Sequence, residues 1–129
     1  MPPVPESEVQ KACLHWLKTH SKVAKVWRNN SGMIKTERGG MVRLGEVGSP
    51  DIMGFFKNSC VFFGVEVKRQ EVYKDGRKKN NAEKKLSEPQ REWLKAITAE
   101  GGLGTVINSV DQLEQDFKIY FSTKKCKKK

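Results

Sequence analysis

The stretch GSPDIMGFFKNSCVFFGVEVK, residues 48–68, decides the fold. Turn-forming residues precede Asp51, an apolar run follows to residue 56, and after three polar residues a second, nearly unbroken apolar run covers 60–67. A continuous apolar run of this length is typical of a strand buried on both faces, and a short polar break between two runs indicates a hairpin. The stretch therefore predicts two adjacent antiparallel strands, with charged residues at their open end.

The register of this pair determines which charged groups meet. Glu66 and Lys68 share one face of their strand, because strand side chains alternate with a period of two. If the turn is the two-residue kind centred on Asn58 and Ser59, Asp51 lies directly opposite Glu66. Opposed carboxylates repel unless a positive group lies between them, and a divalent cation beside Lys68 meets that need.

A purely structural interpretation of the same residues stays open. Glu66 and Lys68 can form an ordinary ion pair, and Asp51 can cap a turn after proline. A slip of one residue in the register would also turn Asp51 to the opposite face.

The remaining elements surround this pair in the order αβ, flap, ββ, αβ, α. Capping-box spacings at Ser7 and Ser87 predict two helix starts, the second reinforced by proline in the first turn. Together these patterns predict an α/β fold of mixed type, in which helices flank a central mixed sheet. The expected elements are a helix at 7–20, a strand at 23–28, a hairpin or flap at 33–44, strands at 51–56 and 60–67, a long loop at 69–86, a helix from 87, a strand at 103–108 and a helix from 109.

Length and charge bound the possible functions. The 129 residues suit one domain, here expected at 1–121 with a flexible basic tail at 122–129. The net charge is +10, and five tail lysines account for half of it, which leaves a basic body. Such an excess favours a polyanionic partner, although surplus lysine also serves solubility alone. The sequence shows neither an apolar run of membrane-spanning length nor a secretory signal, so a cytoplasmic protein without a membrane partner is expected.

Cysteine and histidine usage narrows the catalytic options. The three cysteines are widely spaced, and the two histidines lie five residues apart, so neither a zinc site nor a histidine pair is indicated. Carboxylates that bind a hard cation remain the main catalytic possibility. No nucleotide cofactor is expected.

Four blocks in order along the chain resemble the VRR-NUC family of the PD-(D/E)XK nuclease superfamily. The first is Glu8-Val9-Gln10, the second is 48–51 with Pro50-Asp51, the third is 64–68 with Glu66-Val67-Lys68, and the fourth is 87–90 before Trp93. The resemblance covers roughly residues 7–117. It implies a restriction-endonuclease-like core of order αβββαβ and the activity of a metal-dependent endonuclease in a bacterial or phage-infected cell.

The resemblance also implies roles for individual residues. Asp51, Glu66 and the backbone carbonyl of Val67 would bind Mg²⁺ or Mn²⁺, and Glu8 would add a further carboxylate. Lys68 would orient or activate the attacking water or stabilise developing negative charge. Gln90 would position Lys68 or the nucleophile. Glu8 and Gln90 each have a structural alternative, the first in the helix dipole and the second in the capping box.

DNA, and branched DNA in particular, is the expected partner. Small proteins of this family resemble resolvases of four-way (Holliday) junctions, and symmetric cutting of a junction would need a homodimer. A nickase or flap nuclease and a non-catalytic DNA-binding module are the alternatives. Exposed basic residues of the flap and the long loop are expected to contact the phosphate backbone, although a solvated surface is the simpler interpretation; they are Lys35, Arg38, Arg43, Arg69, Arg77, Lys78 and Lys79.

Overall fold

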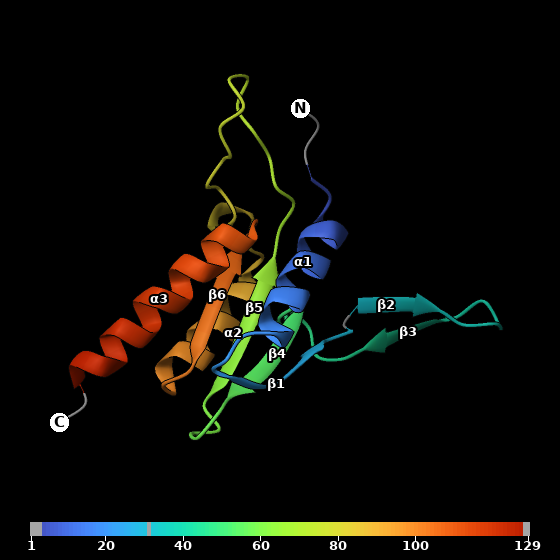
Figure 1. Ribbon diagram of the computed structural model, residues 1–129. Coiled ribbons are helices and arrows are strands. Elements are labelled where there is room, and N and C mark those ends of the chain that lie inside the picture. The colour runs from blue at the N-terminus through green and yellow to red at the C-terminus, as the bar shows by residue number, and fades with distance from the viewer. Residues whose placement is uncertain (1–3, 31, 128–129) are drawn as a thin grey trace.

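A computed structural model describes residues 4–30 and 32–127 of the chain, and the side chains only as far as residue 123. Four strands form the main sheet in the order β1-β4-β5-β6, antiparallel except for the parallel pair β5 and β6. Helices cover both faces, with α1 and α3 on one side and α2 on the other (Figure 1). The predicted mixed sheet flanked by helices is confirmed. The bounds are α1 Glu6–Lys18, β1 Val23–Arg28, β4 Ile52–Phe56, β5 Phe62–Val67, α2 Glu88–Ala99, β6 Leu103–Ile107 and α3 Val110–Lys127.

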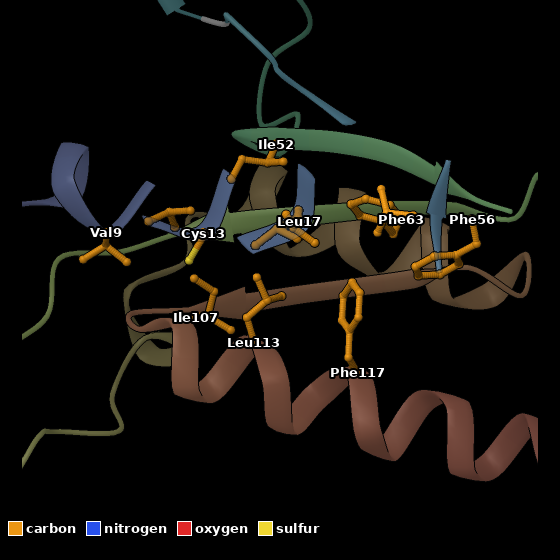
Figure 2. Packing of buried hydrophobic residues seen from close by; sticks show 12 residues of the cluster. Val9, Cys13, Leu17, Ile52, Phe56, Phe63, Ile107, Leu113 and Phe117 are labelled. Carbon is orange, nitrogen blue, oxygen red and sulfur yellow. The ribbon is translucent and has the colours of Figure 1, made fainter. Parts of the chain in front are cut away.

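The main core lies between the sheet and the pair α1 and α3 (Figure 2). Helical spacing places three residues of α1 and two of α3 on the faces that meet the sheet, and alternate residues of the strands point toward them. Burial of each such side chain stabilises the fold by about 1.5–3 kcal/mol. The cluster contains Val9, Cys13, Leu17, Val23, Ile52, Phe56, Phe63, Val65, Val67, Ile107, Leu113 and Phe117.

Glycines bring α2 close to the opposite face of the sheet. A Cβ at Gly64 would lie 2.7 Å from Ile97 Cδ1, and one at Gly104 would lie 2.6 Å from the carbonyl oxygen of Leu94. Because Val65 and Val67 face the main core, the side chain of Glu66 must face α2. The close packing of α2 therefore sets the surroundings of this carboxylate.

The hairpin between β4 and β5 has the predicted register but a different turn. Ile52 pairs with Val65, which places Asp51 opposite Glu66 one residue further along. The predicted two-residue turn is wrong, because the last ladder contact is the hydrogen bond from the Phe56 N–H to the Val61 carbonyl, 2.9 Å, and a four-residue loop covers 57–60. Both turns have the same midpoint, so the longer loop leaves the register unchanged.

Two helix boundaries differ from the predictions. Helix α1 begins at Glu6 with Pro5 as its N-cap and no side-chain cap, so Ser7 lies within the first turn and the predicted capping box there is wrong. Helix α3 continues to Lys127, past the boundary expected at residue 121, so much of the predicted tail is helical backbone. The rest of the predicted tail, 128–129, lies outside the described residues.

The expected flap at 33–44 is a separate two-stranded sheet. Strands β2 (Gly32–Lys35) and β3 (Met41–Leu44) pair antiparallel and project from the main sheet (Figure 1). The expected long loop contains one short 3-10 helix, η1 (Glu83–Lys85). In the part of the chain that the structure describes, no helix has the length and apolarity needed to cross a membrane.

Candidate active site

The carboxylates of Asp51 and Glu66 meet where β4 begins and β5 ends. The Val67 backbone N–H donates a 2.8 Å hydrogen bond to Asp51 Oδ2, which fixes the aspartate against the neighbouring strand. Glu66 is only 2% exposed. The first sequence-predicted pair of site residues is therefore brought together, and it lies on the face of the sheet that α2 covers.

One oxygen of the buried Glu66 carboxylate receives no hydrogen bond from the described residues, and the Asp51 carboxyl lies next to Glu66. Gln90 Nε2 donates to Glu66 Oε1 at 3.2 Å, whereas Glu66 Oε2 is buried without a hydrogen-bond partner among the described residues. Burial, and next the adjacent Asp51 carboxyl, raise the pKa of Glu66 to about 9, against a smaller opposing effect of Lys68. A proton or a cation at Glu66 Oε2 would therefore stabilise this buried carboxylate.

Gln90 joins Glu66 to Lys68. Its side-chain oxygen accepts from Lys68 Nζ at 3.0 Å and from the Ser87 backbone N–H at 2.9 Å. Both partners are donors, so the amide oxygen must face them and the amide nitrogen must face Glu66. Ser87 Oγ also accepts from the Gln90 backbone N–H, which completes the predicted capping box of α2. The capping and bridging roles of Gln90 therefore coexist.

A second set of contacts holds the backbone that presents Asp51. Asn29, just after β1, donates from Nδ2 to Ser49 Oγ at 2.7 Å and to the Pro50 carbonyl at 2.9 Å. Its backbone N–H also donates to the Asp51 carbonyl at 2.8 Å. The sequence does not single out Asn29, because no local pattern indicates a contact across twenty residues.

Gly48 packs the same segment against the start of α2. Its φ is +80°, and a Cβ there would lie 2.5 Å from the Pro89 carbonyl carbon. Glycine is required both for the backbone conformation and for the close approach. Because Pro89 precedes Gln90, this contact couples the position of Asp51 to that of the bridging glutamine.

The structure brings Glu6, rather than the predicted Glu8, toward the site. Desolvation, and then the neighbouring Asp51, raise the pKa of Glu6, while Lys68 opposes the shift. Glu8 instead lines a groove between α1 and the start of α3, together with Lys78 and Asp111. Glu6 and Glu8 both lie in the first turn of α1, and they point to different surroundings because they lie two residues apart on the helix.

The donor set fits a divalent cation through two carboxylates. Within the described residues, no three His, Cys, Asp or Glu side chains are grouped closely enough to hold a metal ion. Asp51 and Glu66 nevertheless offer hard oxygen ligands, and Glu66 Oε2 accepts no hydrogen bond within the part of the chain that the structure describes. The Val67 carbonyl, also predicted as a ligand, belongs to the residue whose N–H binds Asp51.

The predicted DNA-binding residues fall into two groups. Lys35, Arg38 and Arg43 are exposed on the projecting hairpin of β2 and β3. The other four lie between β5 and η1, and three of them pair with acids. The pairs are Arg69 with Glu71 at 2.9 Å, Arg77 with Asp75 at 2.7 Å and Lys78 with Asp111 at 3.2 Å; Lys79 lies over the Tyr73 ring.

Comparison with known proteins places this geometry in a structural class. No protein-family model matches the sequence, and no curated protein matches it. A solved structure described as a VRR_NUC domain protein has a similar fold, with a TM-score of 0.55 over 94% of this chain and 91% of that chain, at 16% identity. The resemblance found in the sequence is therefore confirmed at the level of the fold.

We predict that the pH dependence of stability without divalent ions reports on Glu66. Its folded-state pKa of about 9 exceeds the ordinary value of 4.5, so between these values the folded state holds a proton that the unfolded state has released. The free energy of unfolding should therefore fall as pH rises through this range. Denaturant unfolding in EDTA at about pH 5.5 and about pH 8.5 measures the change.

The control for this prediction is Glu66→Gln, which keeps the shape of the side chain but does not titrate. The variant should lose most of the difference between the two pH values. Equal pH profiles for the wild type and Glu66→Gln would show that Glu66 is ionised in the folded protein across the range.

Proposed function

We propose that this protein is a divalent-metal-dependent DNA endonuclease that hydrolyses phosphodiester bonds and selects DNA by its structure. The main support is the opposition of Asp51 and Glu66, with one buried Glu66 oxygen that receives no hydrogen bond from any described residue and with Lys68 held close by. The fold of a VRR_NUC domain protein and the net charge of +10 agree with this activity.

Asp51 and Glu66 would hold the metal ion, Mg²⁺ or Mn²⁺. A bound divalent ion neutralises charge on phosphate oxygens and lowers the pKa of water. Glu66 must release its proton before it can act as an anionic ligand, so metal affinity increases with pH. Val67 keeps Asp51 in place through its N–H, and the ladder between β4 and β5 fixes the separation of the two carboxylates.

Lys68 supplies the positive charge of the protein at this site. Its ammonium group donates to Gln90 Oε1, which restricts the group to one position next to Glu66. Phosphodiester cleavage adds negative charge to the phosphate oxygens, and a fixed ammonium group stabilises that charge electrostatically. Gln90 is thus a positioning residue, anchored by the capping box at the start of α2.

Branched DNA is the proposed substrate. The basic residues of the projecting hairpin and of the segment after β5 supply contacts to phosphates, which carry shape information but no base sequence. Four-way junctions are the proposed preferred form, cut by a homodimer that carries one site in each subunit. Cleavage of flaps, or single nicks in branched DNA, without symmetric cutting of four-way junctions would identify the nickase or flap-nuclease alternative.

The test compares wild type with Asp51→Asn on labelled four-way junctions, flaps and plain duplex, with Mg²⁺, with Mn²⁺ and with EDTA. Asparagine can still accept the hydrogen bond from Val67, so we expect normal folding and DNA binding. Cleavage should fall by at least about 100-fold, the size typical of losing one charge-stabilising group.

Two outcomes contradict the proposal. Undiminished cutting by Asp51→Asn would remove Asp51 from the active site. Binding of all three DNAs by wild type without cleavage of any would identify a DNA-binding module that has the fold without the activity.

A second prediction separates the bridging role of Gln90 from its capping role. Gln90→Ala removes the bridge to Lys68 and Glu66 together with the bond from the Ser87 backbone N–H, which is one half of the capping box, whereas Ser87→Ala removes only the other half and leaves the bridge. We expect Gln90→Ala to reduce the cleavage rate by about 10- to 100-fold, as is typical for residues that orient active-site groups.

Ser87→Ala should cost about 1 kcal/mol in stability and change the rate by less than about threefold. Circular dichroism melts and single-turnover cleavage measure the two effects. Equal rate losses in the two variants would show that Gln90 acts only through the helix.

A further inference from the structure

The chain forms a small hairpin within the segment that follows Lys68. This hairpin, residues 71–79, is called the finger below. The Tyr73 N–H donates to the Arg77 carbonyl at 2.8 Å, and Gly76 closes the turn with a φ of +90°. Figure 1 shows this segment projecting beyond the end of β5, away from the main sheet. The finger therefore lies at the same end of the sheet as Lys68, which directly follows β5.

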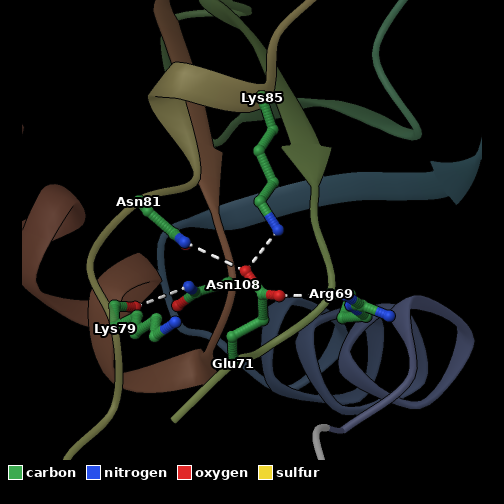
Figure 3. Close-up of polar contacts among 6 residues, drawn as sticks. All are labelled: Arg69, Glu71, Lys79, Asn81, Lys85 and Asn108. Carbon is green, nitrogen blue, oxygen red and sulfur yellow. Dashed lines mark hydrogen bonds and ion pairs between the residues drawn. The ribbon is translucent and has the colours of Figure 1, made fainter. Parts of the chain in front are cut away.

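Polar contacts brace the base of the finger (Figure 3). The Glu71 carboxylate, at the first residue of the finger, accepts hydrogen bonds from side chains that precede the finger and from side chains that follow it. The donors are Lys85, Asn81 at 3.0 Å and Arg69 at 2.9 Å. These donors, Lys85 most strongly, lower the pKa of Glu71 to about 2, so the brace persists at neutral pH.

Asn108 connects the last residue of the finger, Lys79, to the main sheet. Asn108 lies at the end of β6 and is fully buried, and its Nδ2 donates to the Lys79 carbonyl at 2.8 Å. The Lys79 N–H in turn donates to the Glu71 carbonyl at 2.8 Å. The finger is thus a fixed projection of the fold, whose side chains keep a set position relative to β5.

The finger carries one aromatic side chain flanked by cations. Tyr73 is 48% exposed, although aromatic rings of this size are mostly buried. The Arg77 guanidinium lies 5.0 Å and Lys79 Nζ 5.5 Å from the centroid of its ring. An exposed ring with adjacent cations is the combination by which proteins stack on bases and hold the neighbouring phosphates.

We propose that Tyr73 stacks on an unpaired or unstacked DNA base near the cleavage site, while Lys79 holds a phosphate that flanks this base and Arg77, which pairs with Asp75, supports the Tyr73 ring. The proposal rests on the proposed function in taking DNA as the substrate. Paired bases inside a continuous duplex have no free face, whereas branch points and bulges expose one. Stacking by Tyr73 therefore supplies selectivity for distorted DNA that phosphate contacts alone do not provide.

The test measures DNA binding by the full chain in EDTA, where no metal-dependent cleavage interferes. Two labelled probes are compared by fluorescence anisotropy: a duplex of about 30 base pairs, and the same duplex with a central bulge of about three unpaired nucleotides. Tyr73→Ala should weaken binding to the bulged duplex roughly fivefold or more and binding to the plain duplex less than about twofold.

Two matched variants separate stacking from charge and from folding. Tyr73→Phe keeps the ring and should bind like wild type. Lys74→Ala removes an exposed charge from the same turn and should weaken both probes by similar factors. A 2-aminopurine placed in the bulge reports stacking directly, because wild type should quench its fluorescence and Tyr73→Ala should not.

Three results would overturn the proposal: equal losses on both probes with Tyr73→Ala, no loss on either probe, or a loss with Tyr73→Phe as large as with Tyr73→Ala. The absence of any DNA binding by wild type would also overturn it. A parallel cleavage reaction with Mg²⁺ tests the nuclease function separately, since ring-dependent binding without cleavage would retain the role of Tyr73 while refuting the nuclease.

Discussion

The burial of Glu66 opposite Asp51 is the constraint on which the rest of the site depends. Two carboxylates at the junction of neighbouring strands, one of them 2% exposed, are unfavourable unless a proton or a cation accompanies them. Gln90 satisfies only one of the Glu66 oxygens. Burial of this carboxylate lowers the stability of the fold relative to a well-packed apolar residue, and the proposed metal site accounts for its presence.

Three separate elements converge to hold this pair. The ladder between β4 and β5 sets the opposition, the contacts of Asn29 fix the backbone before β4, and the close packing of α2 brings Gln90 to the end of β5. The position of the Lys68 side chain is then set by the period of the strand, because Lys68 lies two residues after Glu66 and on the same face. The site is therefore built on regular elements of the fold.

The sequence predicts the elements that depend on local periodicity and capping. The strand predicted at 23–28, the hairpin or flap predicted at 33–44 and the capping box predicted at Ser87 all follow from short patterns, and the structure contains a strand at 23–28, a hairpin of β2 and β3, and that capping box. The register of β4 and β5 was also correct, although the turn has four loop residues rather than two. The register is unaffected because the observed loop is longer by one residue on each side, which leaves its midpoint unchanged.

Features that depend on tertiary contacts could not be predicted from the sequence. Glu8 was predicted as a ligand from the family resemblance, whereas the structure brings Glu6 of the same helical turn close to Asp51 and Lys68. In the long loop 69–86, the sequence shows only a surplus of positive charge and does not predict a hairpin. The hairpin is held by contacts of Glu71 and Asn108, which lie far apart in the chain. Contacts of this kind have no local pattern in a single sequence.

The central claim is that Asp51 and Glu66 grip one cation together. Diffraction from crystals soaked in Mn²⁺, recorded at a wavelength where manganese scatters anomalously, tests it most directly. The account predicts an anomalous peak between the two carboxylates, within about 2.0–2.3 Å of an oxygen from each. A peak bound by neither carboxylate, or side chains of 51 and 66 turned away from each other in a manganese-loaded crystal, would contradict it.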